Sequence, residues 1–520
     1  MKPIYKKILH VTAAGLLLLN SQGCKNFLDE QPLDTRVEQN FYKTQKDAEE
    51  ALTAVYDALQ WQGATYSSPP MVTDIASDDA FSGGESRSDS PNMISVDQQR
   101  ILPTNSDLEK LWNVEFSGIY KANLLLQKLP QITASEEFKK RTAAEAKFLR
   151  AYFYLDLVRM FENIPLILEP MSGNYCVPQA SPKAVFDQIA LDLSEAIPDL
   201  PAKTLRENQA HATKWAAEAL LARAFLFYNG VYKQNLNAGS ATIDSKKALQ
   251  YLEDVIAKSG HDLLGNYGDI FKKTGEFSIE SVWEISYSNE NPWWDWGYIQ
   301  GGEGNMQPMM QGPRVDGDPA YVRGWSFAPV TQQLVDAFED GDPRKEATIL
   351  SDAELQGTLK KGYQHTGYFS KKYTTAIEYK PANGQLELNW GNNYRSIRFA
   401  DVLLMAAELD IQTGGTSAQT YYNRIRDRVG MPHKTATLDN IYRERRVELA
   451  LEGQRYFDLL RRGQTVADQA ISIQNSKGPH YDGDQIDFNV KFNTATKGFF
   501  PIPQKDVDQC SGTIKQNVGY

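Results

Sequence analysis

The stretch AKFLRAYFYLDLVRMF, Ala146–Phe161, is apolar almost all round when it is placed on a helix. A surface helix has one apolar stripe, so a helix that is apolar on every side is packed on more than one side. The stretch belongs to a longer segment that opens with Ser135-Glu136-Glu137-Phe138, a typical capped start, and ends at Asn163-Ile164-Pro165. The sequence therefore predicts a central helix over Ser135–Phe161.

Most of the remaining chain predicts helices as well. In Ser106–Leu129 the apolar residues recur near the 3.6-residue period, and Pro130 follows. In Thr213–Tyr232, the run WAAEALLARAFLF alternates small and large residues, which allows a neighbouring helix to approach closely. The other predicted helices are Asp47–Gln60, Pro182–Ile197, Ser245–Lys258, Arg395–Gln412, Ser417–Arg428 and Asp439–Arg462.

Consecutive helices predict a repeat architecture. Thr213–Tyr232 with Ser245–Lys258, and Arg395–Gln412 with Ser417–Arg428, have the lengths of antiparallel tetratricopeptide-type pairs. Only Glu280–Tyr287 alternates like a strand. We expect a mainly all-α, helical-repeat (tetratricopeptide-like) scaffold with a few short strands. A loop-rich insertion follows at about residues 289–329. Because no Pro-, Gly- or Ser-rich linker divides the chain, one domain is expected over residues 41–520.

The N-terminus predicts secretion and lipid attachment. Lysines precede the short apolar run Ile8–Leu19, which leads to Gly23 and Cys24. This order is typical of a signal peptide, here residues 1–23, whereas the alternative is a buried N-terminal helix. A lipidated Cys24 would anchor the protein on a membrane, since each buried methylene contributes about 0.8 kcal/mol. Residues 24–40 would then form a tether. Ser21 stands where leucine is usual before such a cysteine.

The overall charge argues against nucleic-acid binding. The 520 residues carry a formal charge of -11, and the loss of residues 1–23 removes three lysines and no acids, which gives -14. Contacts with phosphates need basic surface. Beyond the N-terminus, no segment approaches the roughly 20 apolar residues that span a bilayer.

The cysteines and the short motifs give no indication of an enzyme. Besides Cys24, the chain has Cys176 and Cys510, for which one bridge and two unpaired buried thiols are both open. The six histidines form no metal-ligand pair. The sequence also contains no G-x-S-x-G, no P-loop and no dinucleotide-binding fingerprint.

The segment NPWWDWGY, residues 291–298, is the first candidate for ligand binding. An exposed indole can cover the apolar face of a sugar ring, while neighbouring polar groups take its hydroxyls. The alternative is that these aromatics belong to the core. A loop flanked by Pro and Gly cannot easily bury all of them. The candidates are Trp293, Trp294, Trp296 and Tyr298, with Trp325 on the far side of the loop region.

The polar stretch Thr73–Asp89 could form a second wall of the same site. Asp74, Asp78 and Asp79 could bind hydroxyls or a structural calcium ion, although the spacing is not that of an EF-hand. The favoured interpretation is a solvated loop whose aspartates cap helices.

Three glutamates four residues apart, Glu444, Glu448 and Glu452, could suit glycoside hydrolysis. Arginines are interleaved with them, so charge pairing within a packed helix is the favoured interpretation.

Several segments, in this order along the chain, resemble the SusD/RagB family of surface nutrient-binding lipoproteins. The last of them is similar to the family's PIP…QNPGY ending, with Val518 in place of proline. The segments are CKNFLDEQP (24–32), EAKFLRAYFYLDLVRMF (145–161), ALLARAFLF (219–227), RFADVLLMAAEL (398–409), NRIRDRVG (423–430), ERRVELALEGQRYFDLLRRG (444–463) and FFPIPQKDVDQCSGTIKQNVGY (499–520).

The resemblance implies a lipid-anchored protein on the outer-membrane surface that does not catalyse. Such proteins cap a SusC-like TonB-dependent transporter and capture oligosaccharides for import, and some members take peptides. The resemblance implies that the helical-repeat face packs on the transporter and that loops away from it hold the ligand. This assigns ligand binding to the five loop aromatics, with Asp79 and Arg87 from the early loop. No cofactor is expected apart from a structural calcium ion. A peptide-binding member and a glycoside hydrolase stay as alternatives.

Overall fold

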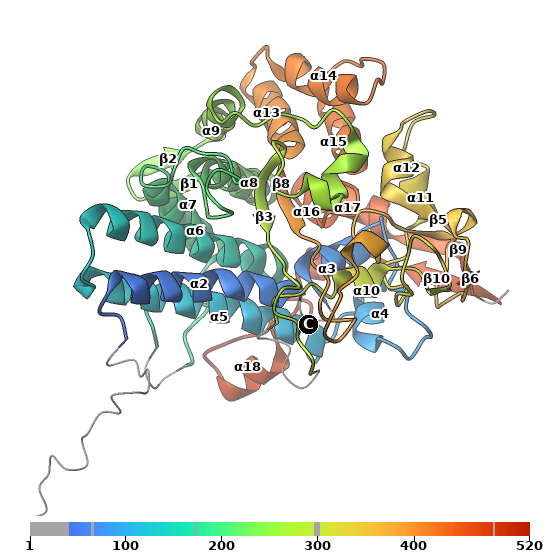
Figure 1. The fold of residues 1–520 in the computed structure, drawn as a ribbon, viewed down its shortest axis with the longest axis horizontal. Helices are drawn as coiled ribbons and strands as arrows, with labels where there is room; N and C mark the ends of the chain where they lie inside the picture. Colours follow the sequence, from blue (N-terminus) through green and yellow to red (C-terminus); the bar gives the residue numbers. More distant parts are fainter. Residues whose placement is uncertain (1–40, 64–66, 172, 174, 296–301, 482–483) are drawn as a thin grey trace, which may run out of the picture.

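Long helices pack side by side around the predicted central helix (Figure 1). The computed structural model describes residues 41–63, 67–171, 173, 175–295, 302–481 and 484–520. The predicted mainly helical architecture is confirmed. Within the described residues, the longer helices are α2 (Gln45–Gly63), α5 (Ser106–Lys128), α6 (Glu136–Phe161), α7 (Pro182–Ala196), α8 (Lys214–Tyr232), α9 (Ser245–Lys258), α13 (Phe399–Thr413), α14 (Ala418–Arg428) and α15 (Leu438–Glu448).

Short helices and strands connect and flank these long helices. The short helices are α3 (Pro69–Ala76), α4 (Pro91–Asp97), α10 (Gln307–Gln311), α11 (Gln332–Val335), α12 (Arg344–Thr348), α16 (Arg455–Arg462), α17 (Gln464–Ile471) and α18 (Gln504–Gln509). The strands pair antiparallel in twos: β1 (Leu236–Ala238) with β2 (Ala241–Ile243), β3 (Ser281–Ile285) with β8 (Tyr394–Arg398), β4 (Val315–Asp316) with β6 (Thr358–Leu359), β5 (Ile349–Ser351) with β7 (Tyr368–Ser370), and β9 (Ile473–Tyr481) with β10 (Asp484–Val490).

Helix α6 is the centre of the helical layer. Its residues from Phe148 to Phe161 are all buried, and it contacts α2, α5, α7 and α8. The hydroxyl of Ser135 caps its start by accepting a hydrogen bond from the backbone N–H of Phe138, at 3.2 Å. The guanidinium of Arg150 joins the layer to α7 through two hydrogen bonds to Asp192, at 2.6 and 2.8 Å. The all-round apolar pattern therefore predicted the position of this helix correctly.

The predicted helix pairs are also present. Helix α8 packs on α9, and α13 packs on α14. Gly414 ends α13 with φ 74°, a left-handed conformation that glycine adopts without steric cost. Gly414 therefore lets the chain turn between α13 and α14.

The expectation that the helix starts at Arg395 was wrong. Residues Tyr394–Arg398 form β8, and α13 begins only at Phe399. In the extended conformation, Arg395 lies opposite Glu284 of β3, and the Arg398 guanidinium reaches Glu280 at 2.6 Å. Burial of both arginines beside these glutamates favours strand over helix.

The expected helix Asp439–Arg462 is in fact two helices, α15 and α16. Leu451 and Gly453 between them have φ 59° and 72°, which no helix accommodates. A Cβ at Gly453 would lie 2.6 Å from the Cα of Pro70. The break therefore lets the chain turn closely over the start of α3.

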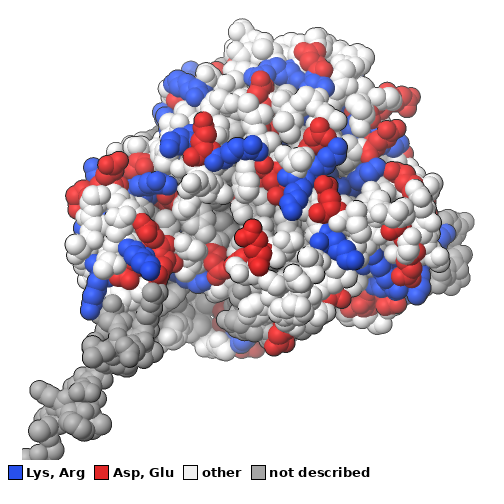
Figure 2. Space-filling view, viewed as in Figure 1, with Lys and Arg blue, Asp and Glu red and all other residues white. Residues whose placement is uncertain are grey.

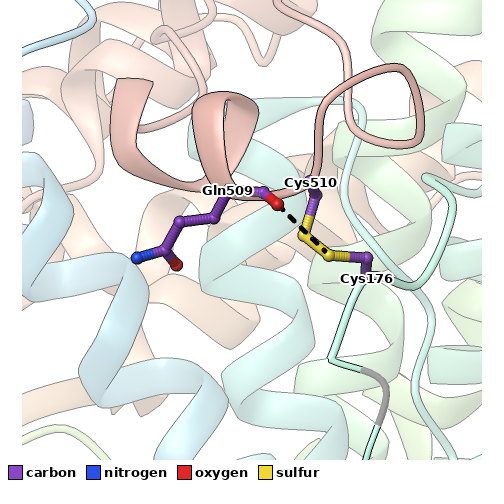
Figure 3. Close-up of a disulfide and its surroundings, with 3 residues drawn as sticks. All are labelled: Cys176, Gln509 and Cys510. Carbon is purple, nitrogen blue, oxygen red and sulfur yellow. Dashed lines mark hydrogen bonds between the residues drawn. A yellow bond between two sulfur atoms is a disulfide. The ribbon is translucent and has the colours of Figure 1, made fainter.

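A disulfide between Cys176 and Cys510 ties the C-terminal segment to the loop before α7 (Figure 3). Of the two alternatives that the sequence left open, the structure has the bridge. The Cys176 Sγ lies 3.8 Å from the carbonyl oxygen of Gln509, a contact and not a hydrogen bond, because a disulfide sulfur carries no proton. Further on, the Asn517 side chain donates hydrogen bonds to the carbonyls of Phe161 and Phe500. The chain end is therefore held against the end of α6.

The charged surface is mixed in sign. Figure 2 shows basic and acidic side chains interspersed over one face, with no continuous basic area of the kind that phosphate contacts need. Among the described residues, none of the helices has both the length and the apolar character needed to cross a membrane.

Candidate ligand-binding site

The tryptophan loop follows β3, and its backbone is fixed by one asparagine. The side chain of Asn389 accepts a hydrogen bond from the Trp293 backbone N–H at 2.7 Å and donates one to the Trp293 carbonyl at 2.8 Å. The backbone N–H of Gln385 donates to the same carbonyl at 2.7 Å. Three hydrogen bonds from residues 385–389 therefore fix the backbone at Trp293 and, with it, the position of the neighbouring Trp294.

The two described tryptophans of this loop lie in different environments. Trp294 is 70% exposed, the largest exposure of any tryptophan among the described residues. Trp293 is half-buried and packs against the main hydrophobic core. Trp296 and Tyr298 lie outside the described residues. A loop of this kind thus presents one large aromatic surface to solvent while the preceding residue anchors it.

Trp325 belongs to the same loop-rich layer. Its backbone N–H donates to the carbonyl of Met309 at 2.7 Å, and its half-buried side chain packs against a small cluster of Met309, Tyr379 and Trp390. Trp390 follows Asn389, the residue that fixes Trp293. Trp293 and Trp325 are more than 30 positions apart in the sequence, yet the residues that hold them, Asn389 and Trp390, are neighbours in the chain.

The early polar loop pairs with the Trp325 segment. Gly83 forms an isolated bridge with Phe327, and the Gly84 backbone N–H donates to the Ser326 carbonyl at 2.9 Å. Gly83 has φ 70°, and a Cβ there would lie 2.3 Å from the Ser326 oxygen, so only glycine fits this approach. The structure therefore places the early loop against the segment that follows Trp325.

Arg314 connects these two segments, and nothing in the sequence indicated its position. Its guanidinium donates to the Trp325 carbonyl at 3.0 Å and to the Asp89 carboxylate at 3.3 Å. Arg87 of the same early loop is exposed, with its guanidinium 6.0 Å from the centre of the Tyr363 ring. Arg87 is thus available to solvent at the edge of the layer.

Asp79 lies in the interior and not on the wall of a groove. It is fully buried, and its carboxylate accepts hydrogen bonds from Arg446 at 2.8 and 3.0 Å. Asp78 pairs with Arg455, and Asp74 accepts a hydrogen bond from the Gly453 backbone. These three aspartates face the turn between α15 and α16 and are buried, so the expectation of a solvated loop is wrong for them, whereas Glu85 and residues 87–89 are exposed. Their carboxylates hold that turn, an arrangement that does not suit ligand contact by Asp79.

The structural calcium ion that the sequence allows stays an expectation. In the described part of the chain, no group of three or more histidine, cysteine, aspartate or glutamate side chains could hold a metal ion.

The three regularly spaced glutamates are buried in ion pairs, as the favoured interpretation predicted. Their partners come mostly from distant elements and not from the interleaved arginines: Arg344 and Arg426 for Glu444, Arg344, Arg398 and Arg428 for Glu448, and Lys372 and Arg398 for Glu452. The three carboxylates are at most 2% exposed and are held by these cations, which weighs against the hydrolase alternative at this position.

A buried carboxyl helps to position the early loop and leads to a prediction. Asp97 accepts hydrogen bonds from the Ser82 backbone and the Gln364 side chain, and burial raises its pKa from the ordinary value to about 7. Between pH 4 and 7 the folded protein therefore holds a proton that the unfolded chain releases, so this group's contribution to stability falls as pH rises. An asparagine at this position keeps an oxygen for both donors. We expect Asp97→Asn to stabilise the protein at pH 8 by an amount on the order of 1–3 kcal/mol.

Urea unfolding at pH 4, 6 and 8 tests this expectation. The stability difference between variant and parent should grow from pH 4 to pH 7 and then level off. Asp336→Asn, at an exposed position, is the control and should show no such trend. A pH-independent loss of stability in Asp97→Asn would show that the carboxyl is ionised in the folded protein.

The fold and these loops define a helical-repeat scaffold that carries an exposed aromatic on a fixed loop. A sequence model of the SusD family matches residues 351–520, and one described as "Starch-binding associating with outer membrane" matches residues 26–226. A solved SusD-like structure that is 33% identical over 92% of this chain agrees with both matches, so the chain belongs to the SusD family.

Solved structures extend the comparison over nearly the whole chain. A laminarin-binding SusD-like protein is 33% identical, with a TM-score of 0.80 over 92% of this chain and 100% of the other. Surface glycan-binding protein A from Bacteroides thetaiotaomicron, solved in complex with laminarihexaose, is 29% identical, with a TM-score of 0.80 over 91% and 100%. A SusD-like protein of Bacteroides ovatus is 25% identical over 93% of this chain and 87% of its own length.

Proposed function

We propose that this protein is a non-catalytic glycan-binding lipoprotein of the outer-membrane surface. It captures an oligosaccharide and passes it to a SusC-like TonB-dependent transporter for import. The exposed indole of Trp294, on a loop fixed by Asn389, is the observation that carries the proposal. Similarity to glycan-binding proteins over nearly the whole chain supports it.

A sugar would bind mainly by stacking. The apolar face of a pyranose ring covers the Trp294 indole, and polar groups at the edges of the loops take the hydroxyls. Arg87, Trp325 and the two residues beyond the described part of the loop, Trp296 and Tyr298, complete the proposed site. Because such a surface buries little of the ligand, we expect modest affinity. The similar laminarin-binding protein makes laminarin oligosaccharides the first ligands to test.

Trp294→Ala is expected to weaken the binding of laminarihexaose about tenfold or more, since it removes the stacking surface. Isothermal titration calorimetry measures the change. The fold should be unaffected, because the side chain is 70% exposed. Tyr175→Ala is the matched control: Tyr175 is 69% exposed and lies beside the disulfide, so its replacement should leave affinity unchanged. Unchanged affinity in Trp294→Ala would remove this loop from the site.

Two alternatives make different predictions in simple assays. Incubation with a panel of polysaccharides distinguishes a binder, which retains the glycan intact, from a hydrolase, which releases products. A peptide-binding member would retain peptides and not glycans.

Membrane attachment and the partner are tested separately from ligand binding. Cys24 and the predicted signal lie outside the described residues. Labelling of cells with a fatty acid should mark the parent protein but not Cys24→Ala. Co-purification of the transporter with the lipidated protein would establish the partnership.

A further inference from the structure

A cavity of about 500 Å³ lies between α2 and β3, and Asn291 at the start of the tryptophan loop contacts one of its lining residues, Glu303, at 3.2 Å. Its walls come from the exposed side of α2, from residues 209–211, from β3 with Ser286, and from Glu303. Trp293, Trp294 and Trp325 are not among the residues that line it. Its volume lies within the roughly 300–1,000 Å³ of typical small-ligand sites.

The lining of this cavity is acidic. It contains Glu50, Asp57, Glu284 and Glu303 but no lysine or arginine. Glu284 is 1% exposed and lies 3.7 Å from the Arg395 guanidinium, which compensates its charge. The Asn291 side chain donates to both oxygens of Glu303, at 3.2 and 3.4 Å, but a neutral amide leaves the negative charge of that carboxylate in place. The three remaining carboxylates of the lining are Glu50, Asp57 and Glu303.

Nearby cations compensate these three carboxylates only in part. The Lys121 ammonium lies 3.6 Å from Asp57, and the Lys46 ammonium lies 3.9 Å from Glu50. Both distances exceed those of hydrogen-bonded pairs. Burial raises the pKa of Asp57; Lys121 and a hydrogen bond from Trp61 oppose this rise, and repulsion by the negative charge of Glu303 adds to it. A cationic ligand would relieve that repulsion.

Aromatic side chains form another part of the wall, and hydrogen bonds fix it in place. Tyr56 and Trp283 both line the cavity, with ring centres 6.4 Å apart. The Tyr56 hydroxyl donates to Glu145 at 2.7 Å, and His211 contacts the same carboxylate at 2.7 Å. These bonds occupy Glu145 and preorganise the wall before any ligand arrives. Aromatic rings beside carboxylates favour organic cations.

The spacing of the acidic groups does not suit a metal ion. Among the described residues, no three histidine, cysteine or carboxylate side chains lie close enough together to hold one. The acidic and aromatic lining instead fits an organic cation, which is larger than a metal ion and carries its charge on one amino group. We propose that this cavity is a second binding site, selective for a small ligand with a protonated primary amine that Asp57 and Glu303 recognise.

The disaccharide of glucosamine is a suitable probe, and cellobiose is its neutral counterpart of similar shape. Calorimetry or ligand-observed NMR with the purified protein should detect the amino disaccharide and show at least tenfold weaker binding of cellobiose. Trilysine carries primary ammonium groups on a peptide. If the amino disaccharide binds more tightly than trilysine, the natural ligand is an amino sugar; if trilysine binds more tightly, it is a basic peptide. Added salt should weaken binding of either amine.

Asp57→Asn with Glu303→Gln removes the charges while keeping the shapes, and should weaken amine binding at least tenfold. Glu49→Gln is the matched control: it makes the same change on α2 at an exposed residue that does not line the cavity, and should have no effect. Circular dichroism and thermal unfolding confirm that each variant is folded. Equal binding of cellobiose and the amino disaccharide, absence of amine binding, or binding that survives the double substitution would each overturn the proposal.

This site and the tryptophan loop can fail independently. Trp294→Ala should leave amine binding intact, and the double carboxylate variant should leave laminarihexaose binding intact.

Discussion

Replacing Arg398 with methionine is expected to lower the free energy of unfolding by about 3–5 kcal/mol, because it leaves buried carboxylates without their cation. Arg398 is fully buried at the end of β8. Its guanidinium contacts Glu280 at 2.6 Å, Glu448 at 3.0 Å and Glu452 at 2.8 Å. Methionine fills a similar volume but carries no charge. The loss of unfolding free energy therefore reports the cost of leaving the carboxylates unpaired and not the cost of a cavity.

Guanidinium unfolding of Arg398→Met gives the free-energy change. The matched control is Arg424→Met, which breaks a pair between a partly exposed arginine and exposed Asp262 at 2.7 Å and should cost less than about 1 kcal/mol. Arg398→Lys keeps the charge but not the planar fork, so an intermediate loss is expected. A loss in Arg398→Met no larger than that of Arg424→Met would show that the buried acids are protonated and neutral.

The pH dependence of stability tests the same network. Burial alone would raise the pKa of Glu448, but the charges of Arg428, Arg398 and Arg344 outweigh it and hold that pKa well below its ordinary value. The folded protein therefore stays ionised where the unfolded chain binds a proton. The stabilisation is complete above the ordinary glutamate pKa, about 4.3, and is lost as the pH falls below it. Acid should destabilise the parent protein more than Arg398→Met.

Removing the Cys176–Cys510 disulfide is expected to lower stability by about 2–5 kcal/mol. The bridge joins residues 334 positions apart, so reduction releases a long closed loop in the unfolded chain. In the folded protein the bridge holds the segment after α18 against the loop before α7 (Figure 3).

Thermal unfolding of Cys176→Ala/Cys510→Ala measures this contribution. Reduction of the parent protein should lower its melting temperature to that of the double variant, and the variant itself should not respond to reductant. A melting temperature equal to that of the oxidised parent would mean that hydrogen bonds such as those of Asn517 hold the C-terminus without the bridge.

Much of the helical scaffold followed from local sequence. The predicted bounds of Ser245–Lys258 agree with α9, and those of Ser135–Phe161 differ from α6 by one residue. Apolar periodicity, capping residues and breakers are local properties, so they act before any tertiary contact forms. Predictions failed where distant partners decide the conformation, as at Arg395–Arg398 and at the break after Glu448.

The candidate site was predictable only in part. The cluster of tryptophans identified the loop, since large aromatics in a loop flanked by Pro and Gly cannot all be buried. Nothing local showed that Asn389 would fix this loop or that Arg314 would join Trp325 to the early loop. The prediction that Asp79 contacts ligand was wrong because its ion-pair partner, Arg446, is 367 residues away in the sequence, and local patterns do not show such a pairing.

The sequence by itself determined the mainly helical scaffold, the family and the aromatic loop, because these depend on the order and spacing of side chains along the chain. Only the tertiary structure decided which charged groups are buried with partners and which face solvent. It also decided between the disulfide and two free thiols, and it formed the acidic cavity between α2 and β3. The physical reason is that an ion pair, a disulfide or a cavity depends on the distance between groups in space, which separation along the chain does not specify.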